Sequence, residues 1–489
     1  MKLCNIGHGF DYELEKLVRI FLPFEKIAVL HEMQDDQRLA VCVRESGRLS
    51  AEVKLDRKSA TRTQEIKDCD DENAERILAV LLYECFAEII GYRPKWGILT
   101  GVRPAKLYSK LCRTMGEDAT KQYFSEKLLV SDNKISLCGE AVQGESKITA
   151  LSRPDSYSLY LSIPFCPTRC AYCSFVSHSI DKAKNMIPKY VELLCKEVEY
   201  TARIARGLGL RLETVYMGGG TPTTLTAEQM DTVLRTVNSC FDTSSVREFT
   251  VEAGRPDTIT PEKLAAIKKN GVTRISINPQ TMNDTVLEEI GRKHTAEDTV
   301  AAFNLARAAG FDNINMDLIA GLPRDTFEGF VNTLDRVLAL DPESVTVHSL
   351  AMKRAATLST DGRLPEAETG DVASRMVDFA RETLTKNGIL PYYMYRQSKT
   401  VGNLENVGYA KRGFEGLYNV YIMDETHTIL ACGASAVTKM RQPSGSNIER
   451  IFNFKYPYEY INRFDEQIER KQGIRAFYET ERMYDCGIF

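Results

Sequence analysis

The sequence predicts an α/β fold in which parallel strands alternate with helices that cross over between them. The first observation is a series of six strand-like runs in the middle of the chain, with helical stretches between them. The second is a set of helix start and end signals in those stretches. Such successive units close into a full or partial barrel, or open into a doubly wound sheet. The hydrophobic period alone leaves both arrangements open.

The length and composition predict a globular chain of several domains. With 489 residues, the chain is about three times the size of a typical domain. Hydrophobic residues make up 43% and charged residues 27%, so a sizeable core is expected and disorder is not. The patterns separate an N-terminal α+β domain at 1–150, of unknown role, from a core domain at 155–360 and a C-terminal α+β extension at 361–489.

The first region mixes short strands with one long helix. Strand-like runs are expected at 26–31, 39–44 and 51–55. In the helix expected at 71–91, Ile77, Leu81 and Cys85 recur on one face at the helical period. A polar passage at 139–154 is expected to be a linker.

The middle region carries the six strands, expected at 158–164, 213–217, 248–253, 274–278, 313–320 and 344–350. Thr226 with Gln229 predicts a capping box, and Thr260 before Pro261 predicts another helix start. Gly271 and Gly310 stand where helix ends are expected. Ligands of such folds gather at the carboxyl ends of the strands, so functional residues are expected there.

The last region begins with a helix at 371–387 and continues with a tyrosine-rich run at 391–397. A glycine-punctuated segment at 402–409 and a run of small residues at 433–437 precede a helical tail.

Charge and hydropathy exclude several classes of function. A net charge of −4 gives no attractive field for a polyanion, so nucleic-acid binding is not expected. The most apolar stretch, 77–90, is interrupted by Glu84 and Glu88 and is too short to span a membrane. The N-terminus does not have the pattern of a signal peptide, so a cytoplasmic location is expected. Thirteen cysteines scattered over the chain then indicate reduced thiols rather than disulfides.

Three cysteines, Cys166, Cys170 and Cys173, stand together directly after the first strand of the middle region. A structural zinc site needs four ligands, so zinc requires a distant fourth donor such as His178. Three thiolates also suit a [4Fe–4S] cluster in which one iron keeps a position for an outside molecule. Ordinary buried cysteines are the third alternative, which three cysteines within eight residues disfavour.

This Cys-x-x-x-Cys-x-x-Cys motif at the start of a parallel α/β domain resembles the radical S-adenosylmethionine (SAM) superfamily. The surrounding residues resemble oxygen-independent coproporphyrinogen III oxidase and its relatives over about 155–440. Segments 96–104 and 402–409, with the long first region, resemble the coproporphyrinogen dehydrogenase-like branch that carries an N-terminal extension. The resemblance implies a partial (β/α)6 radical SAM barrel and a [4Fe–4S] cluster held by the three cysteines. It also implies that SAM chelates the open iron, and that reductive cleavage of SAM yields a 5′-deoxyadenosyl radical.

Further positions match the cofactor contacts of that family one at a time. Tyr160 corresponds to an aromatic residue near the sulfonium, and Tyr172 to one whose backbone meets the adenine. Gly219, Gly220 and Thr221 correspond to the segment that meets the SAM amino group. The remaining matches at strand ends are Glu252, Gln280, Arg292, Asp317 and Ala351. Val437 matches an aliphatic position that contacts a second SAM molecule or the substrate region, with a packing role as the alternative.

The family likeness implies oxidative decarboxylation of coproporphyrinogen III to protoporphyrinogen IX, with a tetrapyrrole substrate. A low-potential flavodoxin or ferredoxin is the implied electron donor. The substrate carboxylates call for basic residues, and the candidates are Arg255, Lys293, Lys353, Arg354 and Arg396.

Two positions depart from the oxidase pattern. Phe175 stands where the oxidase has a cysteine, and Ser162 where it has a histidine. The heme-chaperone relatives also have phenylalanine at the first of these positions, so a heme-binding chaperone is the alternative function. For that function the candidate axial ligands are His178, His348 and His427.

Overall fold

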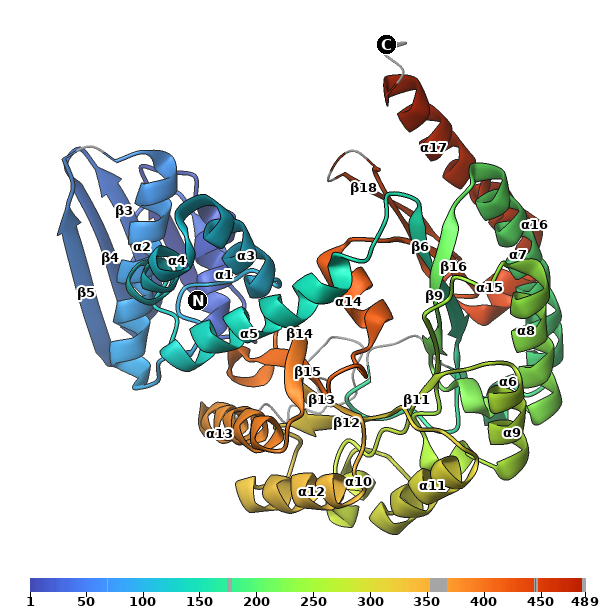
Figure 1. Ribbon diagram of the computed structural model, residues 1–489. Coiled ribbons are helices and arrows are strands. Elements are labelled where there is room, and N and C mark those ends of the chain that lie inside the picture. Colours follow the sequence, from blue (N-terminus) through green and yellow to red (C-terminus); the bar gives the residue numbers. More distant parts are fainter. Residues whose placement is uncertain (68, 174–177, 352–366, 444, 446, 486–489) are drawn as a thin grey trace. The chain divides into compact units, whose positions relative to one another are not determined.

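The computed structural model describes residues 1–67, 69–173, 178–351, 367–443, 445 and 447–485. The chain forms two compact units (Figure 1). The first unit comprises Met1–Val142, Pro365–Ser374 and Met394–Asn406, and the second comprises Gln143–Leu364, Arg375–Tyr393 and Val407–Phe489. Two short segments of the expected C-terminal region therefore fold with the first unit. The division by role into 1–150, 155–360 and 361–489 stays a prediction.

The first unit is built on a five-stranded sheet whose order is β2-β1-β3-β4-β5. Its elements are β1 (Lys2–Ile6), α1 (Asp11–Phe21), β2 (Ala28–Leu30), β3 (Arg38–Glu45), β4 (Arg48–Leu55), β5 (Lys58–Glu65) and α2 (Asp71–Ile90). Leu17 of α1 and Leu78 of α2 share one buried core with Val53 of the sheet. The expected helix at 71–91 is therefore confirmed, with Asp70 as its N-cap.

The segment expected to be a linker contains the boundary between the two units, after Val142, and most of it is helical. After α3 (Pro104–Met115), α4 (Glu117–Gln122) and η1 (Tyr123–Lys127), helix α5 extends over Asp132–Thr149. Cys138 and Ala141 of α5 are fully buried at helical spacing. Gly144 allows close packing, because a Cβ there would lie 2.6 Å from Cα of Tyr392.

The second unit contains the six expected strands as neighbours in one sheet. They are β6 (Ser156–Ile163), β9 (Arg211–Gly219), β10 (Glu248–Glu252), β11 (Arg274–Ser276), β12 (Ile314–Ala320) and β13 (Ser344–Ser349). All five pairings between them are parallel. The full sheet runs in the order β14-β15-β13-β12-β11-β10-β9-β6-β16-β17-β18, so it is open at both edges. The expected partial barrel is confirmed.

Helices cover the outer face of this curved sheet (Figure 1). They are α7 (Ile187–Leu208), α8 (Ala227–Cys240), α9 (Pro261–Lys269), α10 (Asp284–Glu289), α11 (Ala296–Ala308), α12 (Phe327–Ala339) and α13 (Ala367–Lys386). The Thr226–Gln229 capping box is present, and Thr260 caps α9 as predicted. Gly271 and Gly310 have φ angles of 79° and 87° directly after α9 and α11, which confirms the expected helix ends.

Strands β14 to β18 extend the sheet beyond the six that were expected. They are β14 (Leu390–Arg396), β15 (Glu405–Ala410), β16 (Thr428–Cys432), β17 (Val437–Arg441) and β18 (Ile448–Phe452). Strand β16 pairs in parallel with β6, and β15 pairs antiparallel with β13. The remaining elements are β7 (Phe165–Cys166), β8 (His178–Ser179), α6 (Ile180–Ala183), η2 (Pro222–Thr224), η3 (Pro256–Thr258), η5 (Val401–Asn403), α14 (Leu417–Asp424), α15 (Pro457–Asn462), α16 (Phe464–Arg470) and α17 (Gln472–Asp485).

The two faces of the parallel strands differ in character. On the outer face, side chains such as Leu161, Val215 and Val251 are fully buried. On the inner face, polar residues are cross-strand neighbours: Ser158 with Thr214, Tyr160 with Tyr216, Glu252 with Ser276, Ser276 with Asn315, and Asn315 with Ser344. Because strand side chains alternate between faces, this row lies on one side of the sheet.

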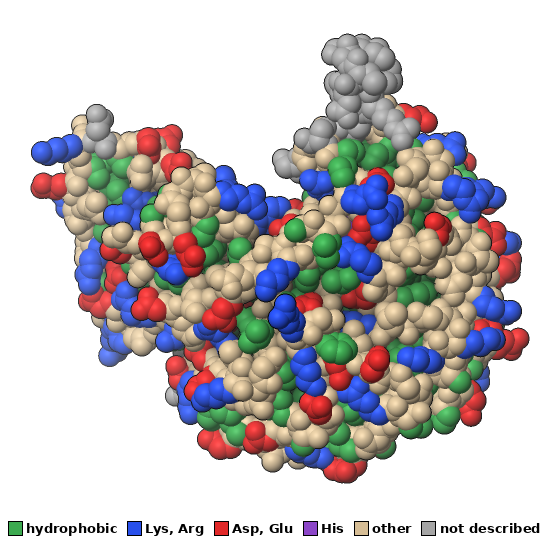
Figure 2. Space-filling view, in the orientation of Figure 1, with side chains coloured by type: hydrophobic (Ala, Val, Ile, Leu, Met, Phe, Trp, Pro, Cys, Tyr) green, Lys and Arg blue, Asp and Glu red, His purple; other side chains and the backbone are tan. Residues whose placement is uncertain are grey.

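None of the helices within the described ranges has the length and apolar character needed to cross a membrane. Lys and Arg side chains alternate with Asp and Glu on the face shown in Figure 2, in keeping with the net charge of −4.

A buried ion pair fixes the turn after β16. Nζ of Lys471 lies 3.1 Å from Oε1 of Glu197, and both side chains are 0% exposed. Lys471 also donates to the carbonyl of Ala431, while the Gly433 N–H and the Tyr460 hydroxyl donate to Glu197. This cluster joins α7, the end of β16 and the C-terminal helices.

Lys471→Met should destabilise the second unit by about 3 kcal/mol, because it leaves the Glu197 carboxylate buried without its cation. Lys196→Met is the matched control, since Lys196 forms an exposed pair with Glu192 and should cost about 0.5 kcal/mol at most. Urea unfolding followed by circular dichroism measures both. Equal losses in the two variants would contradict the structural role of the buried pair.

Candidate functional site

The cysteine loop lies at the carboxyl end of β6, where the sequence predicted it. Cys166 ends β7, which pairs with β8. The Ala171 N–H donates to the carbonyl of Ile290, and the Thr168 hydroxyl donates to the carbonyl of Gly291, both at 3.0 Å. The loop is therefore anchored to the segment that follows α10.

The glycine turn after β9 packs directly against this loop. The Gly220 N–H donates to the carbonyl of Ile163 at 2.8 Å, and the Thr221 N–H donates to that of Phe165 at 2.7 Å. A Cβ at Gly220 would lie 2.6 Å from the Phe165 carbonyl oxygen and 3.0 Å from Sγ of Cys166. Only glycine permits this approach, so the structure brings the two predicted motifs together as expected.

Two of the three cysteine sulfurs accept hydrogen bonds from identified side chains. The Thr221 hydroxyl lies 3.5 Å from Sγ of Cys166, and Nη1 of Arg255 lies 3.6 Å from Sγ of Cys170. Within the described part of the chain, no three Cys, His, Asp or Glu side chains are grouped to hold a metal ion. The donor chemistry of the loop, three thiols of which two have identified hydrogen-bond donors, fits an iron–sulfur cluster.

A stack of three tyrosines lines the inner face next to the loop. Tyr160 and Tyr216 have ring centroids 6.2 Å apart, and Tyr216 stacks on Tyr418 of α14 at 4.5 Å. Tyr160 therefore lies in an aromatic environment. Such an environment can stabilise a nearby cation, which is the role expected for Tyr160. Tyr216 and Tyr418 were not among the residues predicted from the sequence. Thr214, Tyr216 and Gly218 are two residues apart in β9, so they share one face of the strand. This spacing could have placed Tyr216 on the same face as the glycine turn.

Glu252 ends β10 on the same inner face. The Tyr216 hydroxyl donates to Oε1 of Glu252 at 2.6 Å. Burial raises the pKa of Glu252 to about 7, although the Tyr216 hydrogen bond acts in the opposite direction. A carboxyl group that is neutral in part at neutral pH is typical of a functional site.

Gln280 and Arg292 lie on the segment after β11. Gln280 has a φ of 69°, a left-handed conformation that is uncommon outside glycine, and its N–H donates to the carbonyl of Asp317 at 2.9 Å. Arg292 donates to the carbonyl of Asn278 at 2.5 Å and to the Tyr172 hydroxyl at 3.1 Å. Tyr172 and Arg292 are thus in direct contact, which links the cysteine loop to this segment.

Asp317 lies on β12 between two polar neighbours. Nδ2 of Asn315 donates to its Oδ1 at 2.7 Å, and Nε2 of His348 lies 3.8 Å from its Oδ2. Burial acts to raise the pKa of Asp317, but the interactions with His348 and Asn315 hold it below its ordinary value. The side chain is therefore a carboxylate at neutral pH.

Ala351 follows β13, and Val437 begins β17. Their expected cofactor contacts stay predictions, as do those of the other matched residues. Lys353, Arg354 and Phe175 lie outside the described residues.

Two of the basic candidates for substrate carboxylates are not available for that role. Arg255 is 3% exposed and is enclosed by Asp257, Thr168 and Cys170. Arg396 is also 3% exposed, and it donates to the carbonyls of Leu99 and Gly101 within the first unit. Both were misread because a sequence does not show which arginines are buried. Lys293 is exposed and stays a candidate.

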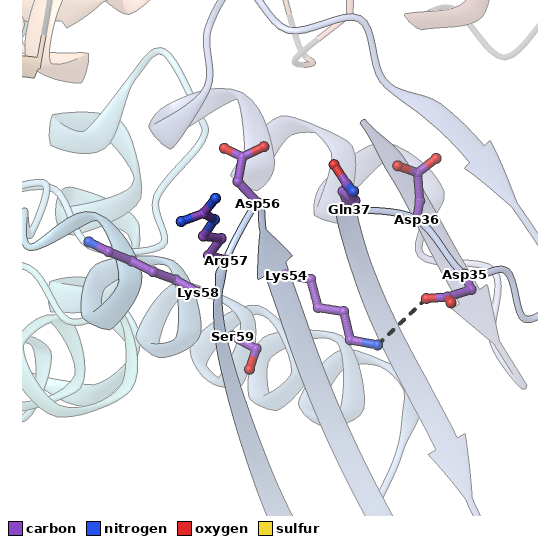
Figure 3. A pocket seen from close by; sticks show the side chains of 8 residues that line it. All are labelled: Asp35, Asp36, Gln37, Lys54, Asp56, Arg57, Lys58 and Ser59. Atoms are coloured by element: carbon purple, nitrogen blue, oxygen red, sulfur yellow. Dashed lines mark ion pairs between the residues drawn. The ribbon is translucent and has the colours of Figure 1, made fainter.

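A pocket in the first unit contains neither cysteines nor buried carboxyl groups like those at the strand ends of the second unit. Residues 35–37, 54 and 56–59 line it with charges of both signs, and Lys54 forms an ion pair with Asp35 at 3.8 Å (Figure 3). The residues that line this pocket are solvated. The candidate site is therefore the one at the carboxyl ends of the parallel strands in the second unit.

The pH dependence of stability should reveal the buried carboxyl group. The folded-state pKa of Glu252, about 7, exceeds the ordinary value of 4.5, so the folded state binds the proton more tightly between these values. Wild type should therefore lose stability relative to Glu252→Gln as the pH rises from about 4.5 to 7, by about 3 kcal/mol in total.

Urea unfolding of both proteins at pH 5, 6, 7 and 8 measures this difference. Glu192→Gln is the control: the pKa of the exposed Glu192 is lowered to about 2 by Lys189 and Lys196. That carboxylate is ionised in the folded state throughout the tested window and mostly ionised in the unfolded state, so its difference curve should change by only about 0.2 kcal/mol. A flat curve for Glu252→Gln would contradict the assignment.

Comparison with known proteins agrees with this geometry. Residues 160–337 match the model of the radical SAM superfamily. The chain is 40% identical over 385 residues to the oxygen-independent coproporphyrinogen-III oxidase-like protein HemZ of Bacillus subtilis, covering 78% of this chain and 77% of that protein. It is 32% identical over 332 residues to the heme chaperone HemW of the same organism, covering 65% and 83%.

The fold also resembles that of coproporphyrinogen III oxidase (HemN) from Escherichia coli, a radical SAM enzyme. The TM-score is 0.52 at 23% identity, over 66% of this chain and 73% of that one. The cofactors of the superfamily are a [4Fe–4S] cluster and SAM, and they are the cofactors of this chain. The chain belongs to the radical SAM superfamily and, within it, to the oxygen-independent coproporphyrinogen III oxidase-like family, which links it to heme and porphyrin metabolism.

Proposed function

We propose that the protein is a radical SAM enzyme that decarboxylates coproporphyrinogen III to protoporphyrinogen IX without oxygen. The observation that carries the proposal is the closure of the Gly220 turn onto the cysteine loop, with Glu252 packed against the same turn at Gly218. The 40% identity to an oxidase-like protein supports the choice of substrate. The expected cytoplasmic location and a flavodoxin or ferredoxin as electron donor belong to the same proposal.

In this proposal Cys166, Cys170 and Cys173 hold the cluster. The bound cofactors supply a 5′-deoxyadenosyl radical. The Gly219, Gly220 and Thr221 backbone would meet the SAM amino group, and the two glycines suit that role because they let this backbone lie directly against the cysteine loop. Residues matched to SAM contacts, namely Tyr160, Tyr172, Glu252, Gln280, Arg292, Asp317 and Ala351, orient SAM and exclude water.

In each of two propionate side chains, a β-hydrogen atom would pass to the 5′-deoxyadenosyl radical, which becomes 5′-deoxyadenosine. CO2 then leaves and one electron passes to an external acceptor, so that a vinyl group remains at each position. The tyrosine stack of Tyr160, Tyr216 and Tyr418 provides flat faces beside the strand edge. Such faces can pack against a pyrrole ring or stabilise the SAM sulfonium.

A heme chaperone is the second candidate, which the 32% identity to HemW over 83% of that protein supports. This function needs an axial ligand for the heme iron. His427 is 3% exposed, stacks on Tyr421 at 3.6 Å and contacts the Ser158 hydroxyl at 2.9 Å. His178 and His348, which are half-buried, are therefore better placed than His427.

Replacing a loop cysteine tests the cofactor assignment. Anaerobically reconstituted Cys170→Ala should lose most of its iron and form 5′-deoxyadenosine only at background level, because a thiolate ligand is missing. Cys195→Ala, a half-buried cysteine on α7, is the control and should keep both properties. Full iron and full SAM cleavage in Cys170→Ala would refute the assignment.

The substrate assay separates the two functions. Reconstituted protein with SAM, a low-potential reductant, an electron acceptor and coproporphyrinogen III should release CO2 and form protoporphyrinogen IX. A parallel titration with heme records its absorbance bands. Stoichiometric heme binding without decarboxylation, while SAM is still cleaved, would replace the oxidase proposal by the chaperone.

A further inference from the structure

A buried arginine reaches the middle cysteine of the loop. Arg255 precedes η3, and its side chain is 4% exposed. Its Nη1 lies 3.6 Å from Sγ of Cys170 and 3.2 Å from Oγ1 of Thr168. The guanidinium therefore points at the sulfur from inside the protein.

The opposite side of the guanidinium is held by a carboxylate. Nε and Nη2 of Arg255 donate to Oδ1 and Oδ2 of Asp257 at 3.0 and 3.1 Å. Asp257 lies 3.6 Å from Nδ1 of His294, whose side chain is 0% exposed. This bidentate pairing fixes the orientation of the guanidinium, so Nη1 stays directed at Cys170.

The sulfur of Cys170 has positive charge beside it. Arg255 donates to this sulfur, and the guanidinium of Arg292 also interacts with it. Hydrogen bonds to the sulfurs and nearby charge set the reduction potential of an iron–sulfur cluster. Reduction adds one negative charge, and a buried cation stabilises that charge more strongly than a solvated one.

We propose that Arg255 is a positioning residue that raises the reduction potential of the cluster by donating a hydrogen bond to Sγ of Cys170. The inference rests on the proposed role of the three cysteines as cluster ligands. Through Arg255, the protein makes the cluster easier to reduce by a one-electron donor of low potential. The substrate-binding role that the sequence suggested for Arg255 is replaced by this one.

The test is the midpoint potential of the reconstituted cluster in Arg255→Gln, Arg255→Lys and wild type. Anaerobic titration against mediators, followed by electron paramagnetic resonance of the reduced cluster, gives the potential. Arg255→Gln should lower the equilibrium constant for reduction about tenfold, which is about 59 mV for one electron. Arg255→Lys, which keeps the charge, should recover at least half of that shift.

Arg235→Gln is the matched control, because it removes one positive charge from the exposed Arg235–Asp231 pair on α8. Its potential should equal that of wild type. An unchanged potential in Arg255→Gln with a full cluster would overturn the inference while leaving the ligand assignment intact. Retention of the cluster in Cys170→Ala would instead overturn the proposed function.

A second measurement tests the inference even if Arg255→Gln does not retain its cluster. In wild-type protein labelled with ¹⁵N-arginine, pulsed electron paramagnetic resonance of the reduced cluster should detect weakly coupled guanidinium nitrogen. Part of that signal should disappear in Arg255→Lys. A spectrum without arginine nitrogen, or one that the lysine variant leaves unchanged, would overturn the inference.

Discussion

The inner face of the parallel sheet imposes one constraint on the whole second unit: its polar side chains are buried, and each must find a partner. An unpaired polar group in such a place costs the free energy of its lost hydration. The Thr214 hydroxyl therefore donates to Ser158, and Asn315 donates to Ser276. At the strand ends, backbone groups, thiols and guanidinium groups hydrogen-bond to one another for the same reason: each is buried and needs a partner.

The two ends of the strands satisfy this constraint differently. At the amino ends of β9 and β10, Arg247 pairs with Glu213, and Ser156 donates to the same carboxylate, so charges of opposite sign meet. At the carboxyl ends, Arg255 donates to the Cys170 thiol as well as to Asp257. The first arrangement stabilises the barrel, whereas the second places a cation beside the sulfur of a loop cysteine.

The sequence could predict what depends on local pattern. The six strands, the Thr226 capping box and the approach of the Gly220 turn to the cysteine loop follow from hydrophobic runs, caps and parallel topology. The helical conformation of the linker expected at 139–154 was not predicted, because the close contact of Gly144 with Tyr392 exists only in the tertiary structure. Tyr418, from a helix far along the chain, and the burial of Arg255 also depend on tertiary contacts, which a single sequence does not encode locally.

The two candidate functions make competing demands on the edge formed by β12 and β13. Decarboxylation in the proposed form uses the Asp317 carboxylate to orient SAM, and His348 at 3.8 Å helps to keep that group ionised. Heme capture through His348 would withdraw the imidazole from Asp317 and leave a buried carboxylate with less compensation. Because this neighbour stabilises Asp317 as an anion, withdrawing His348 to bind heme would carry a cost that the proposed decarboxylase does not incur.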